Sequence, residues 1–281
     1  MSSKILKFTA LNLLAASLSI SVAMAQVPAT NTPYLALGDS IAFGFNPQIQ
    51  PPDLSQYHGY PALLSDTLNL QLTNASCPGE TSGTLAGTSS KYLVGFNCAE
   101  QSSAHELFVS YGGGSQLQYA ISHLQEHPET SLVTINIGGN DLGNLQISCG
   151  GNVACETLGL PAVLLTVGRN LNAIFAGLRK TGYKGPIVAL NYYAFNYKDA
   201  FQVSVFTGLN TVIATTALGH KVAVADGFRA FQAASASTNG DPCAAGLLLK
   251  DPGTATCGTH PSYAGQALLA ATVFKAIPKT K

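Results

Sequence analysis

Four short polar segments of this sequence contain the residue types that acyl-transfer chemistry needs. Gly38-Asp39-Ser40 presents a hydroxyl after a glycine that allows a sharp bend. Gly79 can expose a bare backbone N–H, and Asn140 offers an amide donor. Donors of this kind stabilise a developing oxyanion. His260 is a candidate general base, because a serine hydroxyl is a poor nucleophile until an imidazole accepts its proton.

Five short apolar runs predict the strands that position these segments. They contain β-branched and aromatic residues and mostly lack strict alternation, as strands buried on both faces of a parallel sheet do. The runs are Tyr34–Leu37, Leu70–Asn74, Leu132–Ile137, Pro186–Asn191 and Lys221–Ala225. Helical spacing predicts helices at Tyr60–Leu72, Ser115–His127, Leu158–Lys180, Phe201–Leu218 and Ser262–Ile277. Strands that alternate with helices predict an α/β sandwich.

The predicted sheet brings the polar segments to one edge. Three of the segments directly follow the first, second and third strands, and His260 lies on a predicted loop between the last strand and the last helix. Ligands of an open parallel sheet bind beyond the carboxyl ends of its strands. Glycine-rich stretches at Gly79–Ser90 and Gly112–Ser115 are predicted to be loops over this sheet.

The four segments together resemble the four blocks of the SGNH (GDSL) hydrolases. The four blocks occur in the family's order and span nearly the whole chain after its first 25 residues. They are Gly38-Asp39-Ser40, Gly79 in Cys-Pro-Gly-Glu-Thr, Gly138-x-Asn140-Asp141 and His260-Pro261. The resemblance implies an α/β, three-layer sandwich of flavodoxin type. Its parallel five-stranded sheet would have the order 2-1-3-4-5, with helices on both faces.

The resemblance also implies esterase or lipase chemistry without a cofactor or a metal. Ser40 would be the nucleophile and His260 the general base. The N–H groups of Ser40 and Gly79 and the side chain of Asn140 would form the oxyanion hole. The physical chemistry of each group agrees with the role that the family gives it.

One position departs from the family's pattern. The family usually carries Asp three residues before this histidine, and this chain has Cys257 there. Asp251 and Asp241 lie upstream on the same long loop, and either could complete a triad. A backbone carbonyl of the Ala255–Gly258 turn could instead accept the imidazole N–H and leave a Ser–His dyad.

The first 25 residues have the pattern of a signal peptide. Lys4 and Lys7 precede a mostly apolar stretch, and Ala23-Met24-Ala25 suits a signal peptidase. We expect cleavage after Ala25, a single catalytic domain over residues 26–281, and a secreted or periplasmic protein. The apolar run is short for a membrane span, so no stable membrane anchor is expected.

Six cysteines follow the predicted cleavage site, and an oxidising compartment turns such even sets into disulfides. Six cysteines allow 15 connectivities. The spacing favours three local pairs, Cys77–Cys98, Cys149–Cys155 and Cys243–Cys257. A zinc site is the competing interpretation, but no cysteine pair has the spacing of zinc ligands.

The charge balance narrows the class of partner. The chain has 14 Lys+Arg against 14 Asp+Glu, and only 10% of its residues are charged. This composition gives no electrostatic basis for binding nucleic acid. A small-molecule, lipid or glycan ester is the expected substrate, and the oligomeric state is left open.

Three other interpretations compete with a serine hydrolase of this family. His123-Leu124-Gln125-Glu126-His127 matches the HxxEH signature of a zinc peptidase. Gly38-Asp39-Ser40-Ile41-Ala42 approaches the nucleophile elbow of α/β-hydrolases, although that elbow lies in mid-chain. A secreted carbohydrate- or surface-binding protein that lost turnover is the third, and the missing aspartate is its support.

Overall fold

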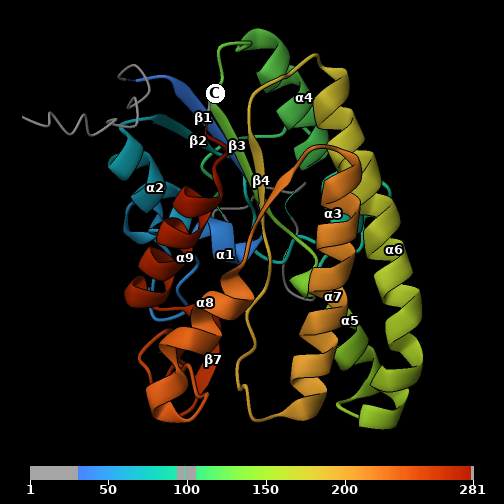
Figure 1. Ribbon diagram of the computed structural model, residues 1–281, viewed down its shortest axis with the longest axis vertical. Helices are drawn as coiled ribbons and strands as arrows, with labels where there is room; N and C mark the ends of the chain where they lie inside the picture. Colours follow the sequence, from blue (N-terminus) through green and yellow to red (C-terminus); the bar gives the residue numbers. More distant parts are fainter. Residues whose placement is uncertain (1–30, 94–97, 99–105, 280–281) are drawn as a thin grey trace, which may run out of the picture.

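Five parallel strands form the central sheet of the computed structural model, which describes residues 31–93, 98 and 106–279 (Figure 1). The strands are β1 (Pro33–Gly38), β2 (Gln71–Asn74), β3 (Leu132–Asn136), β4 (Ile187–Leu190) and β5 (Ala223–Ala225). Their order is β2-β1-β3-β4-β5, and every pairing is parallel. The predicted fold class and strand order are therefore confirmed. The predicted signal peptide lies outside the described residues.

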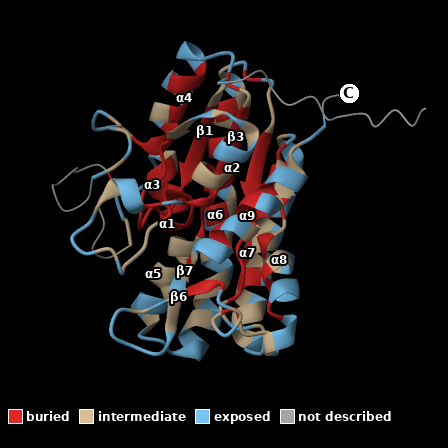
Figure 2. Ribbon diagram, turned by 90° about the vertical axis from the view of Figure 1, so that its left-hand side faces the viewer, coloured by how far each residue is buried: buried red, intermediate tan, exposed pale blue. Residues whose placement is uncertain are grey.

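The strands at the centre of the sheet are buried on both faces. Every residue of β3 and β4 is buried, and so is every residue of β1 after Pro33 (Figure 2). This burial explains why the apolar runs lack strict alternation. The Tyr34 hydroxyl finds a partner inside the sheet, because it lies 2.7 Å from Thr134 Oγ1 on the neighbouring strand.

Helices cover both faces of the sheet (Figure 1). The helices α2 (Tyr60–Leu68), α8 (Gly227–Ala234) and α9 (Tyr263–Ala276) pack on one side. The other side carries α3 (Ser82–Ala86), α4 (Gln116–Glu126), α6 (Val153–Lys180) and α7 (Ala200–Gly219). The four-residue helix α1 (Ser40–Phe43) follows β1, and α5 (Gly139–Cys149) follows β3. The result is the three-layer sandwich expected from the sequence.

Several boundaries differ from the prediction. Helix α2 ends at Leu68, because Asn69 adopts a left-handed conformation and closes it. Helix α6 begins at Val153 rather than Leu158, and the Asn152 side chain caps it by accepting from Cys155 N. Helices α5 and α8 were not predicted, and the stretch expected to be a loop over Gly79–Ser90 contains α3.

The prediction also missed a short antiparallel hairpin near the C-terminus. Strand β6 (Leu248–Lys250) pairs with β7 (Cys257–Pro261), and β7 leads directly into α9. A strand of three residues gives too little alternation to be recognised in sequence. His260 therefore lies in a strand rather than on the predicted loop.

Three disulfides join neighbouring parts of the chain. They link Cys77 to Cys98, Cys149 to Cys155, and Cys243 to Cys257, with Cα–Cα distances of 6.2, 5.6 and 5.7 Å. These are the local pairs that the spacing favoured. The second closes the corner between α5 and α6, and the third ties the start of β7 to the loop before β6.

Helices α6 and α7 are unusually apolar. Among the described residues they are the two helices that could cross a membrane by length and composition. Within those windows, 28% of α6 and 22% of α7 is buried. Each helix packs one face against the core, through Leu171 and Ile174 in α6 and through Leu209 in α7.

We expect two leucines of α6 to respond differently to the same substitution. Leu171 is 1% exposed and lies in the core, whereas Leu158 is 84% exposed. Leu171→Ala should lower the free energy of unfolding by about 2–5 kcal/mol, because it removes buried methyl groups and leaves a cavity. Leu158→Ala should change it by less than about 0.5 kcal/mol. Urea unfolding of both variants checks this, and equal losses would contradict the described packing of α6.

Candidate active site

The end of β1 makes a sharp turn that presents Ser40 at the carboxyl edge of the sheet. Gly38 has φ of +136°, and a Cβ atom there would lie 2.3 Å from the Asn136 carbonyl oxygen. Only glycine fits this conformation and this close approach. Asp39 then caps α1 by accepting from Ile41 N at 2.9 Å, and Ser40 becomes the first residue of the helix.

His260 reaches Ser40 from the other end of the chain. Its Nε2 lies 3.1 Å from Ser40 Oγ, within hydrogen-bond distance. Tyr193, in the segment after β4, holds β7 in place, because its hydroxyl donates to the Thr259 carbonyl at 2.6 Å. The Phe45 ring meets the imidazole edge-on, with centroids 5.1 Å apart. The structure therefore brings together the two residues that the sequence proposed as nucleophile and base.

The imidazole is held in its neutral form. Burial lowers the pKa of His260 from its ordinary value to about 4, and the Asp251 charge opposes this shift. A neutral imidazole can accept a proton, whereas a charged one cannot. The side chain is therefore competent as a base well below neutral pH.

Neither candidate third residue bonds to this histidine. The Asp251 carboxylate packs over Gly258, where a Cβ atom would lie 2.3 Å from its Oδ1. Its charge reaches His260, but no hydrogen bond joins the two side chains in the described part of the chain. The Asp241 carboxylate instead accepts from Ala244 N at 3.0 Å and caps a turn.

Three N–H donors come from the ends of β1, β2 and β3, at the carboxyl edge of the sheet. Asn140, in the first turn of α5, uses one amide hydrogen to donate to the Glu80 carbonyl at 2.8 Å, so its second hydrogen is available. Gly79 is buried in the loop after β2. Neither the Gly79 N–H nor the Ser40 N–H donates to an acceptor among the described residues. These are the donors that the sequence proposed for an oxyanion hole.

The Asp39 carboxyl accepts two hydrogen bonds beside the nucleophile turn. Tyr192 OH donates to its second carboxyl oxygen, and Ile41 N donates to the first. Burial raises the pKa of Asp39 to about 7, against the effect of these two hydrogen bonds. With a hydrogen bond to each oxygen, this carboxyl fixes the conformation of the turn.

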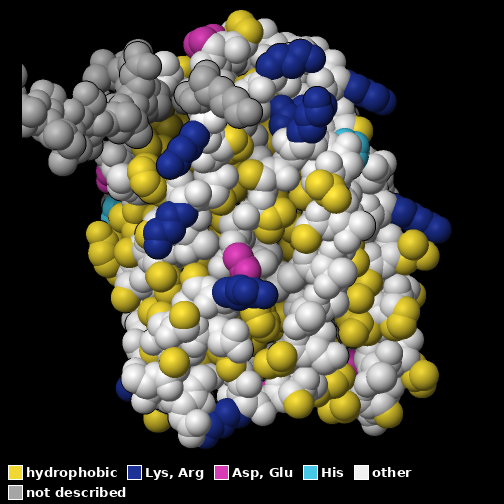
Figure 3. Space-filling view, viewed as in Figure 1, with side chains coloured by type: hydrophobic (Ala, Val, Ile, Leu, Met, Phe, Trp, Pro, Cys, Tyr) yellow, Lys and Arg dark blue, Asp and Glu magenta, His cyan; other side chains and the backbone are white. Residues whose placement is uncertain are grey.

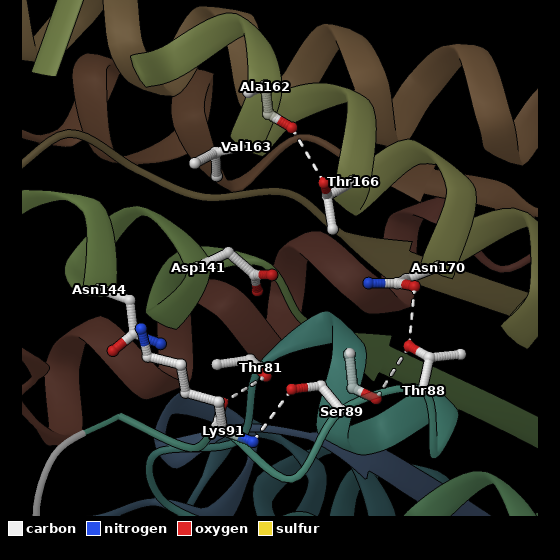
Figure 4. A pocket seen from close by; sticks show the side chains of 11 residues that line it. Thr81, Thr88, Ser89, Lys91, Asp141, Asn144, Ala162, Val163, Thr166 and Asn170 are labelled. Carbon is white, nitrogen blue, oxygen red and sulfur yellow. Dashed lines mark hydrogen bonds between the residues drawn. The ribbon is translucent and has the colours of Figure 1, made fainter.

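The first turn of α5 is also tied to α3. Asp141 accepts from Ser82 N at 2.8 Å and from Ser82 Oγ at 2.7 Å, and Asn170 Nδ2 donates to the same hydroxyl. A pocket of about 420 Å³ opens beside these bonds, between α3, α5 and α6 (Figure 4). The bonds fix Asp141, and with it the neighbouring Asn140.

The candidate zinc ligands lie away from this edge. Helix α4 ends at Glu126, and His127 Nδ1 lies 3.3 Å from Glu129 Oε1. In the part of the chain that the structure describes, the one cluster with three potential metal ligands is Cys77, Glu80 and Cys98. Both of its sulfurs are joined in a disulfide, so no thiolate is available as a ligand.

The sequence and the structure were compared with known proteins. The profile of the GDSL-like Lipase/Acylhydrolase family matches residues 36–268 of the 281. The chain belongs to this family. The match includes Ser40, Gly79, Asn140 and His260, so the resemblance found in the sequence is confirmed. A search of curated proteins found no match.

Solved structures share the fold at low sequence identity. An extracellular lipase from Streptomyces rimosus has a TM-score of 0.61 at 20% identity, covering 87% of this chain and 99% of that one. Phospholipase A1 from Streptomyces albidoflavus NA297 has a TM-score of 0.60 at 19% identity, covering 89% of this chain and 100% of that one. An acetyl xylan esterase from Geobacillus stearothermophilus has a TM-score of 0.54 at 16% identity, covering 91% of this chain and 99% of that one. These likenesses support the fold of this GDSL family member.

We expect the imidazole of His260 to titrate near pH 4. Asp251→Asn should lower this midpoint further, because it removes the negative charge that favours the imidazolium. Asp241→Asn is the matched control and should leave the midpoint unchanged, since Asp241 caps a separate turn. NMR titration of the His260 ring measures all three. A midpoint near the ordinary value of about 6.5 would contradict the described burial.

Proposed function

We propose that this member of the GDSL family is an exported serine hydrolase that cleaves carboxylic esters. The observation that carries the proposal is the 3.1 Å contact between Ser40 Oγ and the neutral His260 imidazole. The N–H groups of Ser40 and Gly79, which have no acceptor among the described residues, and the second amide hydrogen of Asn140 support it. The family gives the general class, an ester hydrolase, and these residues support the mechanism that we propose.

In the first half of the proposed reaction, Ser40 Oγ attacks the ester carbonyl carbon while its proton passes to His260 Nε2. The carbonyl oxygen becomes an oxyanion and accepts hydrogen bonds from Ser40 N, Gly79 N and Asn140 Nδ2. The carbon–oxygen bond to the alcohol then breaks. The alcohol leaves with the proton from His260, and the acyl group remains on Ser40.

In the second half, water replaces the alcohol. His260 accepts a proton from the water as its oxygen attacks the acyl carbon, and the same three donors stabilise the second oxyanion. The bond to Ser40 Oγ breaks, and Oγ takes the proton back from His260. The products are one alcohol and one carboxylic acid for each ester and water consumed.

We further propose that Ser40 and His260 act as a dyad, with the Asp251 charge at a distance. The Asp251 carboxylate lies over Gly258, near the imidazole in sequence, yet makes no hydrogen bond to it. Asp251 would therefore assist the imidazolium only through space. A through-space charge stabilises an imidazolium less than a hydrogen-bonded carboxylate does.

The proposed substrate is a small-molecule, lipid or glycan ester. The face of the molecule in Figure 3 carries scattered charged side chains among many apolar and neutral ones, and only 10% of the residues in the chain are charged. Such a surface gives no advantage to a charged substrate. The structurally similar proteins include a phospholipase A1, a lipase and an acetyl xylan esterase, so the fold accommodates both lipid and sugar esters.

Export is part of the proposal. Residues 1–25 would be the signal peptide, and residues 26–281 the catalytic domain. Three disulfides support an oxidising destination, either secreted or periplasmic. One of the structurally similar lipases is extracellular.

Ser40→Ala should lower kcat on short-chain p-nitrophenyl esters by more than about 10³-fold, because it removes the atom that forms the acyl intermediate. An organophosphonate should label the wild type and not this variant. Ser148→Ala is the matched control, since Ser148 is an exposed serine of α5 whose hydroxyl donates within its own helix. Equal rates for Ser40→Ala and wild type would contradict a serine hydrolase. Absence of both labelling and turnover in the wild type would favour a binding protein.

Asp251→Asn and Asp241→Asn test the dyad. A triad aspartate that holds its histidine contributes about 10⁴-fold to kcat. We expect each variant to lower kcat by less than about tenfold, because neither carboxylate bonds to His260. A loss of the larger size in a variant with unchanged thermal stability would identify that residue as the third member of a triad.

A further inference from the structure

A buried glutamine side chain grips the peptide that precedes the nucleophile turn. Gln116 is the first residue of α4, 78 positions from Gly38, and it is 0% exposed. Its Oε1 accepts from Gly38 N at 2.5 Å, and its Nε2 donates to the Gly38 carbonyl at 3.0 Å. Two bonds to one residue fix the position and the orientation of its backbone. That backbone leads directly into Asp39 and Ser40.

Glu80 connects the Gln116 side chain to Asn140 of helix α5. Its carboxyl is 0% exposed, and its Oε2 accepts from Gln116 Nε2 at 3.0 Å. The carbonyl of the same residue accepts from Asn140 Nδ2 at 2.8 Å. A continuous hydrogen-bonded path therefore runs from the Asn140 amide through Glu80 and Gln116 to Gly38.

The burial of this carboxyl is costly for the protein. Glutamate is almost never fully buried unless it is paired, and no cation bonds to Glu80 in the described part of the chain. Its Oε1 has no hydrogen-bond partner there. Burial raises the pKa of Glu80 to about 8, and the Asp39 charge adds to that effect. The carboxyl is therefore mostly protonated at neutral pH.

The proposed chemistry does not use the Glu80 side chain. Glu80 nevertheless adjoins two of the proposed oxyanion donors, because it follows Gly79 in the chain and its carbonyl accepts from Asn140 Nδ2. Asn140 must lie at a set distance from the nucleophile, because both act on the same carbonyl group of the substrate. A displacement of about 1 Å in such a group can cost about 10²-fold in rate. The neighbouring Asp141–Ser82 bonds hold α5 against α3, but they make no contact with β1.

We propose that Glu80 is a positioning residue, which acts through Gln116 to hold the nucleophile turn and the oxyanion amide of Asn140 in register. This inference rests on the proposed serine hydrolase function. Glu80 touches neither the substrate nor the reacting atoms. Its effect should therefore appear in kcat rather than in KM.

Two substitutions of similar size separate positioning from packing. Glu80→Gln keeps an acceptor for Gln116 Nε2 and should retain most of the wild-type kcat. Glu80→Met fills the same space without an acceptor and should lower kcat about 10²-fold with little change in KM. Gln116→Met removes both bonds to Gly38 and should reproduce that loss. It also serves as the second variant if Glu80→Met does not fold.

Thr134→Val is the control for lost stability alone. Thr134 makes a buried hydrogen bond to Tyr34 in the middle of the sheet, outside this path. This variant should lower the melting temperature and leave kcat unchanged. If Glu80→Met behaves in the same way, or if Glu80→Gln loses as much kcat as Glu80→Met, Glu80 is not a positioning residue of this kind.

A double-mutant cycle completes the test. Because Glu80 and Gln116 belong to one path, Glu80→Met/Gln116→Met should lose no more kcat than the worse single variant. Multiplied losses would overturn a shared path. The two proposals fail separately: turnover that survives Ser40→Ala overturns the function, whereas turnover that needs Ser40 but not Glu80 or Gln116 overturns only the positioning role.

Discussion

The contact between Ser40 Oγ and His260 Nε2 joins groups that are 220 positions apart in the chain. Closing so long a loop costs conformational entropy, and the contact itself offsets little of that cost. The packing of the sheet and its helices offsets this entropy cost instead. It fixes β1 between β2 and β3, and α9 packs on β4 and β5 and carries the hairpin back to α1. The chemistry of the site therefore depends on the completed core.

Burial shifts the pKa of three titratable groups at this edge so that the neutral form of each is favoured. It raises the pKa of the carboxyls of Asp39 and Glu80 and lowers that of the His260 imidazole. Each shift favours the neutral form of its group. The nucleophile turn therefore lies in surroundings of low polarity. Backbone and amide N–H dipoles act more strongly on a new negative charge in such a medium than in water.

The sequence was most informative where burial is complete. Strands β1, β3 and β4 could be predicted because both of their faces are buried, and three of the four polar segments because each follows a strand. Helix α5 was missed because Gly139, Asn140 and Asp141 at its start favour a turn. Gln116 was missed for a different reason. At the start of a helix it looks like an ordinary polar residue, and only tertiary packing brings it to Gly38.

All three disulfides lie in segments at the catalytic end, after β2, at the α5–α6 corner and in the β6–β7 hairpin, and none links two strands of the sheet. The apolar core can therefore assemble without them. The three covalent links instead restrain the loops that surround the candidate site, outside the strands of the sheet.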